Sequence, residues 1–281
     1  MPLTAATRRH LSPESNVKAG QPRGPWSSAR LLVALAMAVA FAGCSRNDAD
    51  PYSVVARVAH DTTAYTQGLV YAEGQLYEST GLLGQSQVRR VNRTSGQVEA
   101  AVALAADRFG EGLTLLDGKL YQLTWTSMVG YVYDAATLTP LDSFRYDGEG
   151  WGLTTDGDAL IMSDGTAQLR FVDPGTFAVV REVTVRDQGS PLSQLNELEY
   201  IEGTIFANIY RSDWIVRIDP DSGTVVEWID LADLLPERER TITTDVLNGI
   251  AWDGNARHLL VTGKRWPWLF ELRLASSGLV P

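Results

Sequence analysis

The sequence predicts an all-β protein that forms a five-bladed β-propeller, closed by its own N-terminal strand. Three observations predict this fold: a short motif recurs five times, each recurrence is followed by apolar runs of strand length, and one further run precedes the first repeat. Repeats of about 40–50 residues with four strands each are typical of propeller blades. The chain has 281 residues, 44% of them hydrophobic, which is enough to build cores between five blades.

The recurring motif stands at the start of each repeat, and its second residue recurs after 44, 40, 45 and 52 residues. In chain order the motifs are Gln67-Gly68-Leu69, Glu111-Gly112-Leu113, Trp151-Gly152-Leu153, Asn196-Glu197-Leu198 and Asn248-Gly249-Ile250. Five motifs predict five blades.

Within each repeat the motif opens a first strand, and a tight turn connects it to a second. The Glu73-Gly74 and Asp117-Gly118 pairs predict hairpin turns, because glycine accepts the positive φ that such turns require. Third strands are expected at residues 88–91, 130–133, 169–172, 215–218 and 269–272. Fourth strands are expected at residues 98–102, 138–141, 178–183 and 225–229.

The two ends of the repeat region predict how the ring closes. The fifth repeat ends near Leu274 without a fourth strand, whereas residues 54–58 form a strand pattern that has no partner before the first repeat. We expect this strand to complete the last blade, because closure removes an open sheet edge. Residues 53–274 are thus the predicted propeller and 275–281 a C-terminal tail. Residues 230–245 are expected to be a surface excursion with a short helical turn.

The N-terminal region has the pattern of an export signal. Residues 31–41 form an uninterrupted apolar run of 11 residues after a basic stretch, and Ala42-Gly43-Cys44 follows it. We interpret residues 1–43 as a lipoprotein-type signal peptide, Cys44 as the lipidated residue and 44–52 as a tether; cleavage without lipidation is the alternative. We therefore expect a monomeric periplasmic protein that contacts a membrane only through a lipid anchor on Cys44.

Charge and composition exclude several classes of function. The formal net charge is -10, and a body this acidic repels the phosphate backbone of nucleic acids. One cysteine and three histidines exclude a disulfide scaffold and leave too few ligands for a usual zinc site. The chemistry must therefore use carboxylates, amides, lysine and aromatic side chains.

Equivalent positions of propeller blades meet around one axis, so the repeats predict which side chains share the channel. The residues that open the motifs form a first ring, Gln67, Glu111, Trp151, Asn196 and Asn248. The residues that follow the second strands form a second ring, Gly81, Trp125, Gly165, Tyr210 and Lys264. Together the rings predict a pocket with a central carboxylate, amides, one ammonium group and aromatic walls. A polar channel filled with ordered water is the alternative.

Each of these groups suggests a chemical role. Glu111, surrounded by aromatic side chains, should have a raised pKa, which suits a proton shuttle. Lys264 and Asn196 could donate hydrogen bonds to a carbonyl oxygen that gains negative charge. The aromatic side chains could bind a flat or cationic group; they are Trp125, Trp151 and Tyr210. Glu78 and Glu197 are expected instead to bond backbone amides between blades.

At these residues the sequence resembles the plant-type glutaminyl-peptide cyclotransferase family, a group of five-bladed propeller enzymes. The matching stretches are residues 65–69 (YTQGL), 77–82 (YESTGL), 109–114 (FGEGLT), 150–153 (GWGL), 195–200 (LNELEY), 246–252 (VLNGIAW) and 261–267 (VTGKRWP). They extend from about Tyr65 to Leu272 and include every blade.

The resemblance implies conversion of the N-terminal glutamine of peptides or proteins to pyroglutamate with release of ammonia. It implies that Glu111 is the catalytic acid and base and that Asn196 and Lys264 contact the substrate. Further pocket positions are Tyr65, Gln67, Phe109, Trp125, Trp151, Tyr210 and, from the first ring, Asn248. Tyr65 stands where the plant enzyme has Phe, and Tyr210 where it has Trp. These two differences affect what the resemblance implies about substrate preference more than what it implies about the chemistry.

The expected mechanism is intramolecular, because the α-amine attacks the γ-carbonyl of its own residue. It requires neither a nucleophilic side chain nor a metal or other cofactor, although a structural calcium ion is compatible with the sequence. One alternative is a calcium-dependent propeller lactonase or hydrolase, with Glu111, Asn196 and Asn248 as oxygen ligands. Another is a periplasmic propeller that binds peptides without catalysis.

Overall fold

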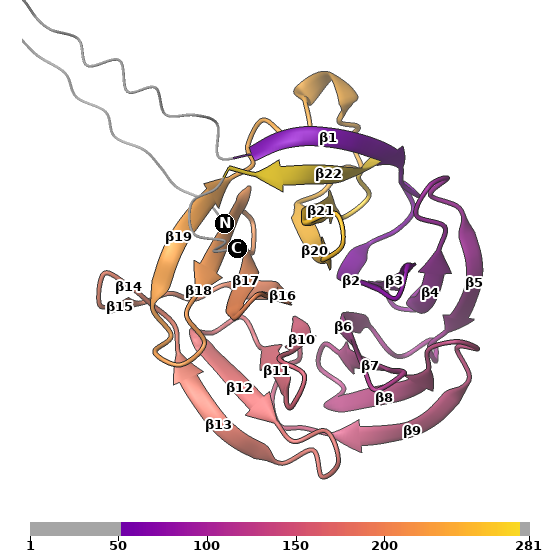
Figure 1. Cartoon of the computed structure of the whole chain (residues 1–281). Helices are drawn as coiled ribbons and strands as arrows, with labels where there is room; N and C mark the ends of the chain where they lie inside the picture. Colours follow the sequence, from indigo (N-terminus) through magenta and orange to yellow (C-terminus); the bar gives the residue numbers. More distant parts are fainter. Residues whose placement is uncertain (1–51, 276–281) are drawn as a thin grey trace, which may run out of the picture. The chain divides into compact units, whose positions relative to one another are not determined.

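The computed structural model describes residues 52–275, and these form a five-bladed β-propeller (Figure 1). Each blade is a four-stranded antiparallel sheet, and the five innermost strands surround the central axis. The predicted signal peptide, Cys44, residues 44–51 of the tether and residues 276–281 of the tail lie outside the described residues. The predicted fold class is confirmed.

The first two blades follow the predicted strand order from the axis outward. Blade 1 consists of β2 (Thr66–Ala72), β3 (Gln75–Thr80), β4 (Gln87–Val91) and β5 (Val98–Ala103). Blade 2 consists of β6 (Gly110–Leu116), β7 (Lys119–Thr124), β8 (Val129–Asp134) and β9 (Pro140–Arg145). The turns between the first and second strands are the predicted hairpins, since Glu73, Gly74, Asp117 and Gly118 all have positive φ, between 51° and 79°.

The next two blades repeat this order. Blade 3 consists of β10 (Leu153–Thr155), β11 (Leu160–Ser163), β12 (Gln168–Val172) and β13 (Val179–Thr184). Blade 4 consists of β16 (Leu195–Ile201), β17 (Thr204–Ile209), β18 (Trp214–Ile218) and β19 (Val225–Asp230). A two-stranded hairpin that the repeats did not predict, β14 (Arg186–Asp187) with β15 (Ser190–Pro191), lies in the connection between these blades.

The fifth blade joins the two ends of the described chain. It consists of β20 (Leu247–Asp253), β21 (His258–Gly263), β22 (Trp268–Leu274) and, outermost, β1 (Tyr52–Ala59). β1 pairs antiparallel with β22, with Val58 opposite Leu269 (Figure 1). The prediction that the N-terminal strand closes the ring is therefore confirmed, and the strand covers an edge that β22 would otherwise expose.

One predicted strand is displaced. The fourth strand of blade 2 was expected at residues 138–141, but β9 begins at Pro140 and continues to Arg145. Leu138 has a φ of 58° and is 1% exposed, so it occupies a turn and packs inward beneath it. An apolar residue that anchors a turn has the same sequence signal as one that begins a strand.

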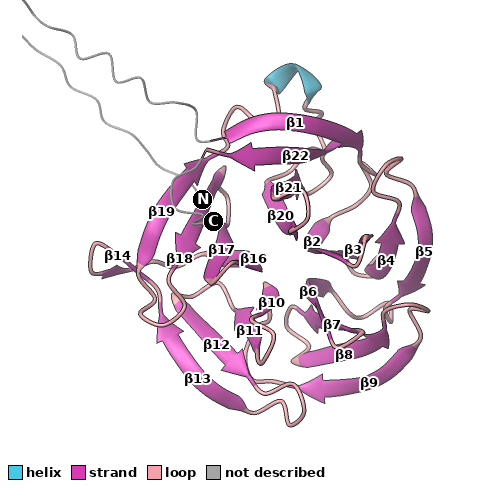
Figure 2. Cartoon of the chain, viewed as in Figure 1, coloured by secondary structure: helices cyan, strands magenta, loops and turns pink. Residues whose placement is uncertain are grey.

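The insertion between β19 and β20 packs into the core, so its interpretation as a surface excursion is wrong in part. It contains the predicted helical turn, η1 (Glu237–Glu239), which lies outside the ring (Figure 2). However, Leu231, Leu234 and Leu235 are buried in one cluster with Trp266. Burial of these side chains fixes the segment that leads to β20 and the pocket.

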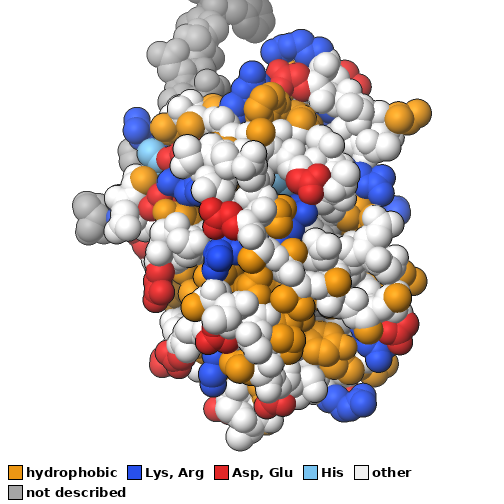
Figure 3. Space-filling view, turned by 90° about the vertical axis from the view of Figure 1, so that its right-hand side faces the viewer, with side chains coloured by type: hydrophobic (Ala, Val, Ile, Leu, Met, Phe, Trp, Pro, Cys, Tyr) orange, Lys and Arg blue, Asp and Glu red, His pale blue; other side chains and the backbone are white. Residues whose placement is uncertain are grey.

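Figure 3 shows one side of the propeller, on which acidic, basic and apolar side chains are interspersed. Of the residues that the structure describes, none forms a helix of the length and hydrophobicity needed to span a bilayer.

Candidate active site

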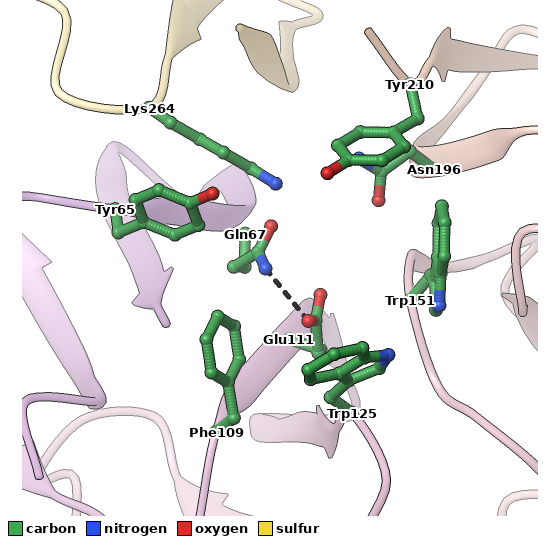
Figure 4. Close-up of a pocket in the computed structure, with 9 residues that line it drawn as sticks. All are labelled: Tyr65, Gln67, Phe109, Glu111, Trp125, Trp151, Asn196, Tyr210 and Lys264. Carbon is green, nitrogen blue, oxygen red and sulfur yellow. Dashed lines mark hydrogen bonds between the residues drawn. The ribbon is translucent and has the colours of Figure 1, made fainter. Parts of the chain in front are cut away.

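One end of the central channel opens into a pocket of about 240 Å³. Nine of the ten predicted site residues line it: Tyr65, Gln67, Phe109, Glu111, Trp125, Trp151, Asn196, Tyr210 and Lys264 (Figure 4). The sheet register explains why both rings meet there. In each hairpin the first strand starts opposite the end of the second, as Gly110 opposite Thr124 and Leu195 opposite Ile209. Residues that begin the inner strands therefore lie beside residues that follow the second strands.

Glu111 is the carboxylate at the centre of this pocket. It lies in β6 and is 4% exposed, and its Oε1 atom accepts a hydrogen bond from Nε2 of Gln67 at 2.8 Å (Figure 4). Burial raises the pKa of Glu111 well above its usual value, the charge of Lys264 lowers it, and the charge of Glu149 raises it further. A carboxyl group whose pKa is raised can donate a proton as a general acid and, once ionised, accept one as a general base.

Asn248 does not line the pocket, so its predicted role as a substrate-binding residue is not supported by its position. It is fully buried in β20, and its Nδ2 atom donates to the carbonyl oxygen of Thr66 at 3.0 Å and to Oε1 of Gln67 at 3.3 Å. The second bond turns the amide of Gln67 so that its NH₂ group faces Glu111. Asn248 thus orients the side chain that bonds the carboxylate.

Lys264 follows β21 and is 3% exposed. Its Nζ atom lies 4.9 Å from the ring centroid of Tyr65 and 5.2 Å from that of Tyr210, so two aromatic faces contact the cation. Burial lowers the pKa of Lys264, while the charges of Glu111 and Asp245 raise it. Among the described residues, no side chain forms a hydrogen bond or ion pair with Nζ, so its N–H groups can be donated to a bound ligand.

Aromatic side chains form the walls of the pocket in two groups. The ring of Phe109 packs edge-on against Tyr65 at 6.1 Å and against Trp125 at 5.7 Å between centroids. On the other side Trp151 packs edge-on against Tyr210 at 5.3 Å. Both tyrosines keep an aromatic face toward the pocket, and the hydroxyl of Tyr65 donates to Oδ2 of Asp245 at 3.2 Å.

Two members of the predicted second ring, Gly81 and Gly165, do not line the pocket but lie behind its walls. A Cβ atom on Gly81 would collide with the ring of Phe109, and one on Gly165 would lie 2.7 Å from Cζ2 of Trp151. Gly165 also has a φ of 80°, which disfavours other residues. At these blades the equivalent position is a glycine because an aromatic ring from the neighbouring strand fills the space.

The two carboxylates expected to bridge blades behave differently. Glu197 is fully buried and accepts hydrogen bonds from the backbone amides of Leu69 at 3.2 Å and Ile250 at 2.8 Å, so this prediction is confirmed. The prediction for Glu78 is wrong, because its oxygens contact side chains: Thr66 at 2.6 Å, His60 at 3.0 Å and Arg89 at 2.7 Å. The buried cation of Arg89 is the partner that Glu78 needs, and no repeat pattern indicates it.

Two further residues near the pocket were not predicted from the sequence. Asp245 accepts the hydroxyl of Tyr65, and Glu149 accepts the indole N–H groups of both Trp125 and Trp151. Both lie in connections between blades, which lack the periodicity that located the rings. The only available signal was the position of Glu149 two residues before the third motif.

Of the three oxygen ligands considered for a calcium-dependent hydrolase, Glu111 and Asn196 line the pocket. Within residues 52–275, no three side chains of His, Cys, Asp or Glu converge where they could hold a metal ion. Asn248, the third of these ligands, donates its Nδ2 atom to Gln67, and its Oδ1 atom has no hydrogen-bond partner among the described residues. The ammonium group of Lys264 shares the pocket with Glu111 and would repel a cation there.

Comparison with known proteins agrees with this geometry. A family model described as glutamine cyclotransferase matches residues 29–274. A glutaminyl-peptide cyclotransferase of Arabidopsis thaliana is 46% identical over 231 residues, which cover 80% of this chain and 72% of the relative. The crystal structure of Myxococcus xanthus glutaminyl cyclase is similar with a TM-score of 0.74 and 39% identity, over 79% of this chain and 96% of that one. The chain belongs to the glutamine cyclotransferase family.

Proposed function

We propose that this protein converts the N-terminal glutamine of peptides and proteins to pyroglutamate with release of ammonia, and that Glu111 transfers the proton. The substrate is suggested by the names of the Arabidopsis and Myxococcus relatives. The observation on which the proton transfer rests is the buried carboxyl group of Glu111, whose pKa burial raises well above the usual value. It faces a pocket with aromatic walls and one ammonium group.

The reaction needs little more than folding of the substrate and movement of protons. The α-nitrogen of the terminal glutamine forms a bond to its own Cδ, and the bond from Cδ to the side-chain nitrogen breaks. Glu111 accepts a proton from the attacking amine and delivers it to the departing nitrogen, which leaves as ammonia. The proton count balances, and the substrate itself supplies the proximity of the reacting groups.

Lys264 and Asn196 are the groups suited to stabilise the intermediate. When the amine attacks, the γ-carbonyl oxygen gains negative charge, and N–H donors held at that point in a site with little water lower the barrier. Lys264 has N–H groups that no described side chain accepts, and Asn196 lines the same pocket. The aromatic walls limit access of water to the reacting atoms.

The direct test is release of ammonia from a dipeptide amide that begins with glutamine. We expect the purified protein to release it with or without EDTA, since we propose that no metal is required, whereas Glu111→Gln should lose at least about a hundredfold in rate. A wild-type protein without activity would refute the function, and activity abolished by EDTA would favour the calcium-dependent hydrolase. Full activity of Glu111→Gln would refute the role of the carboxyl group.

We further propose that the protein is exported and that it is a monomer anchored to a bacterial membrane by lipid on Cys44. The support for export and lipid attachment is the sequence pattern alone, in which Ala42-Gly43-Cys44 follows the apolar run of residues 31–41 and contains the single cysteine. Mass spectrometry of the mature N-terminus, compared with Cys44→Ala, would detect the lipid, and light scattering would give the mass of the purified protein.

A further inference from the structure

Glu149 connects the two tryptophan walls of the pocket. It lies in the segment between β9 and β10, outside the set of residues that line the pocket. Its Oε2 atom accepts hydrogen bonds from Nε1 of Trp125 at 2.7 Å and from Nε1 of Trp151 at 2.8 Å. Trp125 follows the second strand of blade 2 and Trp151 precedes the first strand of blade 3, so one oxygen atom joins the walls of neighbouring blades.

The position of this oxygen determines which way the rings face. An indole has a single polar atom, and a hydrogen bond from it to a carboxylate is stronger than one to a neutral acceptor. In Figure 4 the nitrogen atoms of Trp125 and Trp151 lie on the same side of the pocket. Because its nitrogen is held there, each indole ring can use the rest of its surface for other contacts. Trp125 packs against Phe109, Trp151 packs against Tyr210, and both rings remain available to the ligand.

The backbone around Glu149 is held independently of its side chain. Arg170 of β12 donates to the carbonyl oxygens of Asp147 at 2.6 Å and Glu149 at 3.3 Å. The amide of Gly150 donates to the carbonyl oxygen of Trp125 at 3.0 Å. The backbone that carries the Glu149 carboxylate is therefore fixed. Removal of the carboxylate should free the two indole rings without releasing the segment between β9 and β10.

We propose that Glu149 is a positioning residue, whose carboxylate holds the indoles of Trp125 and Trp151 in the orientation that forms the pocket for the terminal glutamine of the substrate. The proposal rests on the proposed function, because it assigns these walls to glutamine binding. Glu149 acts through the two tryptophans and does not touch the reacting atoms. The negative charge of Glu149 has a second effect, because it raises the pKa of Glu111. Burial raises this pKa more strongly, and the charge of Lys264 lowers it.

Two substitutions separate orientation from charge. In Glu149→Gln the amide oxygen has two lone pairs and can still accept both indole N–H groups, but the charge is gone. In Glu149→Ala both acceptors and the charge are lost. Asp147→Asn is the matched control, because it removes an exposed carboxylate of the same segment whose side chain contacts neither tryptophan.

Kinetics on a glutaminyl dipeptide amide should distinguish these variants. We expect Glu149→Ala to raise KM about tenfold or more, with a smaller change in kcat, and Glu149→Gln to keep KM within about threefold of wild type. The acid limb of the kcat/KM profile should move to lower pH in both Glu149 variants and stay in place in Asp147→Asn. A wild-type KM in Glu149→Ala, or a KM equally raised in Glu149→Gln, would overturn the proposal.

A second measurement does not depend on catalysis. In ¹⁵N-labelled protein, two indole N–H signals should move upfield in Glu149→Ala relative to wild type and Asp147→Asn, because their protons lose a carboxylate acceptor. Unchanged indole signals would refute the positioning role of Glu149 even if the enzyme were active. If the signals move as expected but the wild-type protein releases no ammonia, the contact of Glu149 with the two indoles is supported and the proposed reaction is refuted.

Discussion

The Nε2 atom of Gln67 lies 2.8 Å from Oε1 of Glu111, and it is the one hydrogen-bond donor to this carboxylate among the residues that the structure describes. The bond favours the charged form of a carboxyl group that burial makes hard to ionise. The opposite end of the Gln67 amide is held by Asn248. A chain of three side chains from three blades therefore sets both the direction and the proton affinity of Glu111.

The substitution Gln67→Leu tests this bond. Without the donor the charged form of Glu111 is less stable, so its pKa should rise and the acid limb of the kcat/KM profile should move to higher pH. We expect kcat/KM at neutral pH to fall about tenfold, which corresponds to about 1.4 kcal/mol. A pH profile that coincides with wild type, measured on folded protein, would contradict the assignment of this limb to Glu111.

Lys264→Met should remove most of the activity. The ammonium group lowers the pKa of Glu111 and has N–H groups to donate to the carbonyl oxygen, so its loss affects both acid–base chemistry and charge stabilisation. We expect kcat to fall about 10²- to 10³-fold. The control is Lys119→Met, an exposed lysine of β7, which should retain wild-type rates. Retention of more than a tenth of the wild-type kcat would refute the role of Lys264.

Gly165→Ala should narrow the pocket without touching its polar groups. A methyl group at this position would lie 2.7 Å from the Trp151 ring, and the φ of 80° is strained for alanine. We expect KM to rise several-fold and the midpoint of thermal unfolding to fall. Gly157→Ala, at an exposed turn of the same blade with a φ of 98° and open space around it, controls for the backbone effect alone. Equal KM values for the two variants would contradict displacement of Trp151.

The stability of the fold should be highest in mild acid. Burial raises the pKa of Glu199 from 4.5 to about 8, so its contribution is complete below pH 4.5 and is lost as pH rises toward 8. His60, for which the attraction of Glu78 outweighs the opposing effect of burial, has a pKa above 6.5 and contributes in the same direction. For Glu78 burial is outweighed by Arg89 and His60, which lower the pKa to about 2, so stability is lost as pH falls from 4.5 toward 2.

Urea unfolding between pH 3 and pH 9 would measure this dependence. The free energy of unfolding should decrease on the alkaline side, since a tenfold change in a proton dissociation constant is worth about 1.4 kcal/mol. Glu199→Gln should flatten this decrease, because the amide cannot ionise and can still accept from Trp252 and donate to Thr154. A variant with the same alkaline slope as wild type would show that Glu199 does not titrate in this range.

The repeats were sufficient to locate most of the site. Because equivalent positions of the blades surround one axis, the residues at the motif starts and after the second strands predicted which side chains share the pocket, including Glu111, Trp151 and Lys264. The hairpin turns at Gly74 and Gly118 and the closing strand were predicted for the same reason, since each has a local or periodic signal.

By itself, the sequence determined the number of blades, the closure of the ring and most of the residues that meet at the channel mouth, because these depend on spacing along the chain. Only the tertiary structure decided which way the side chains at those positions point. It turned Asn248 toward Gln67, placed Gly165 behind Trp151 and brought Glu149 to two indoles. The physical reason is that these contacts join segments that are not equivalent in the repeat, where packing and hydrogen bonding across blades, and not periodicity, select the partner.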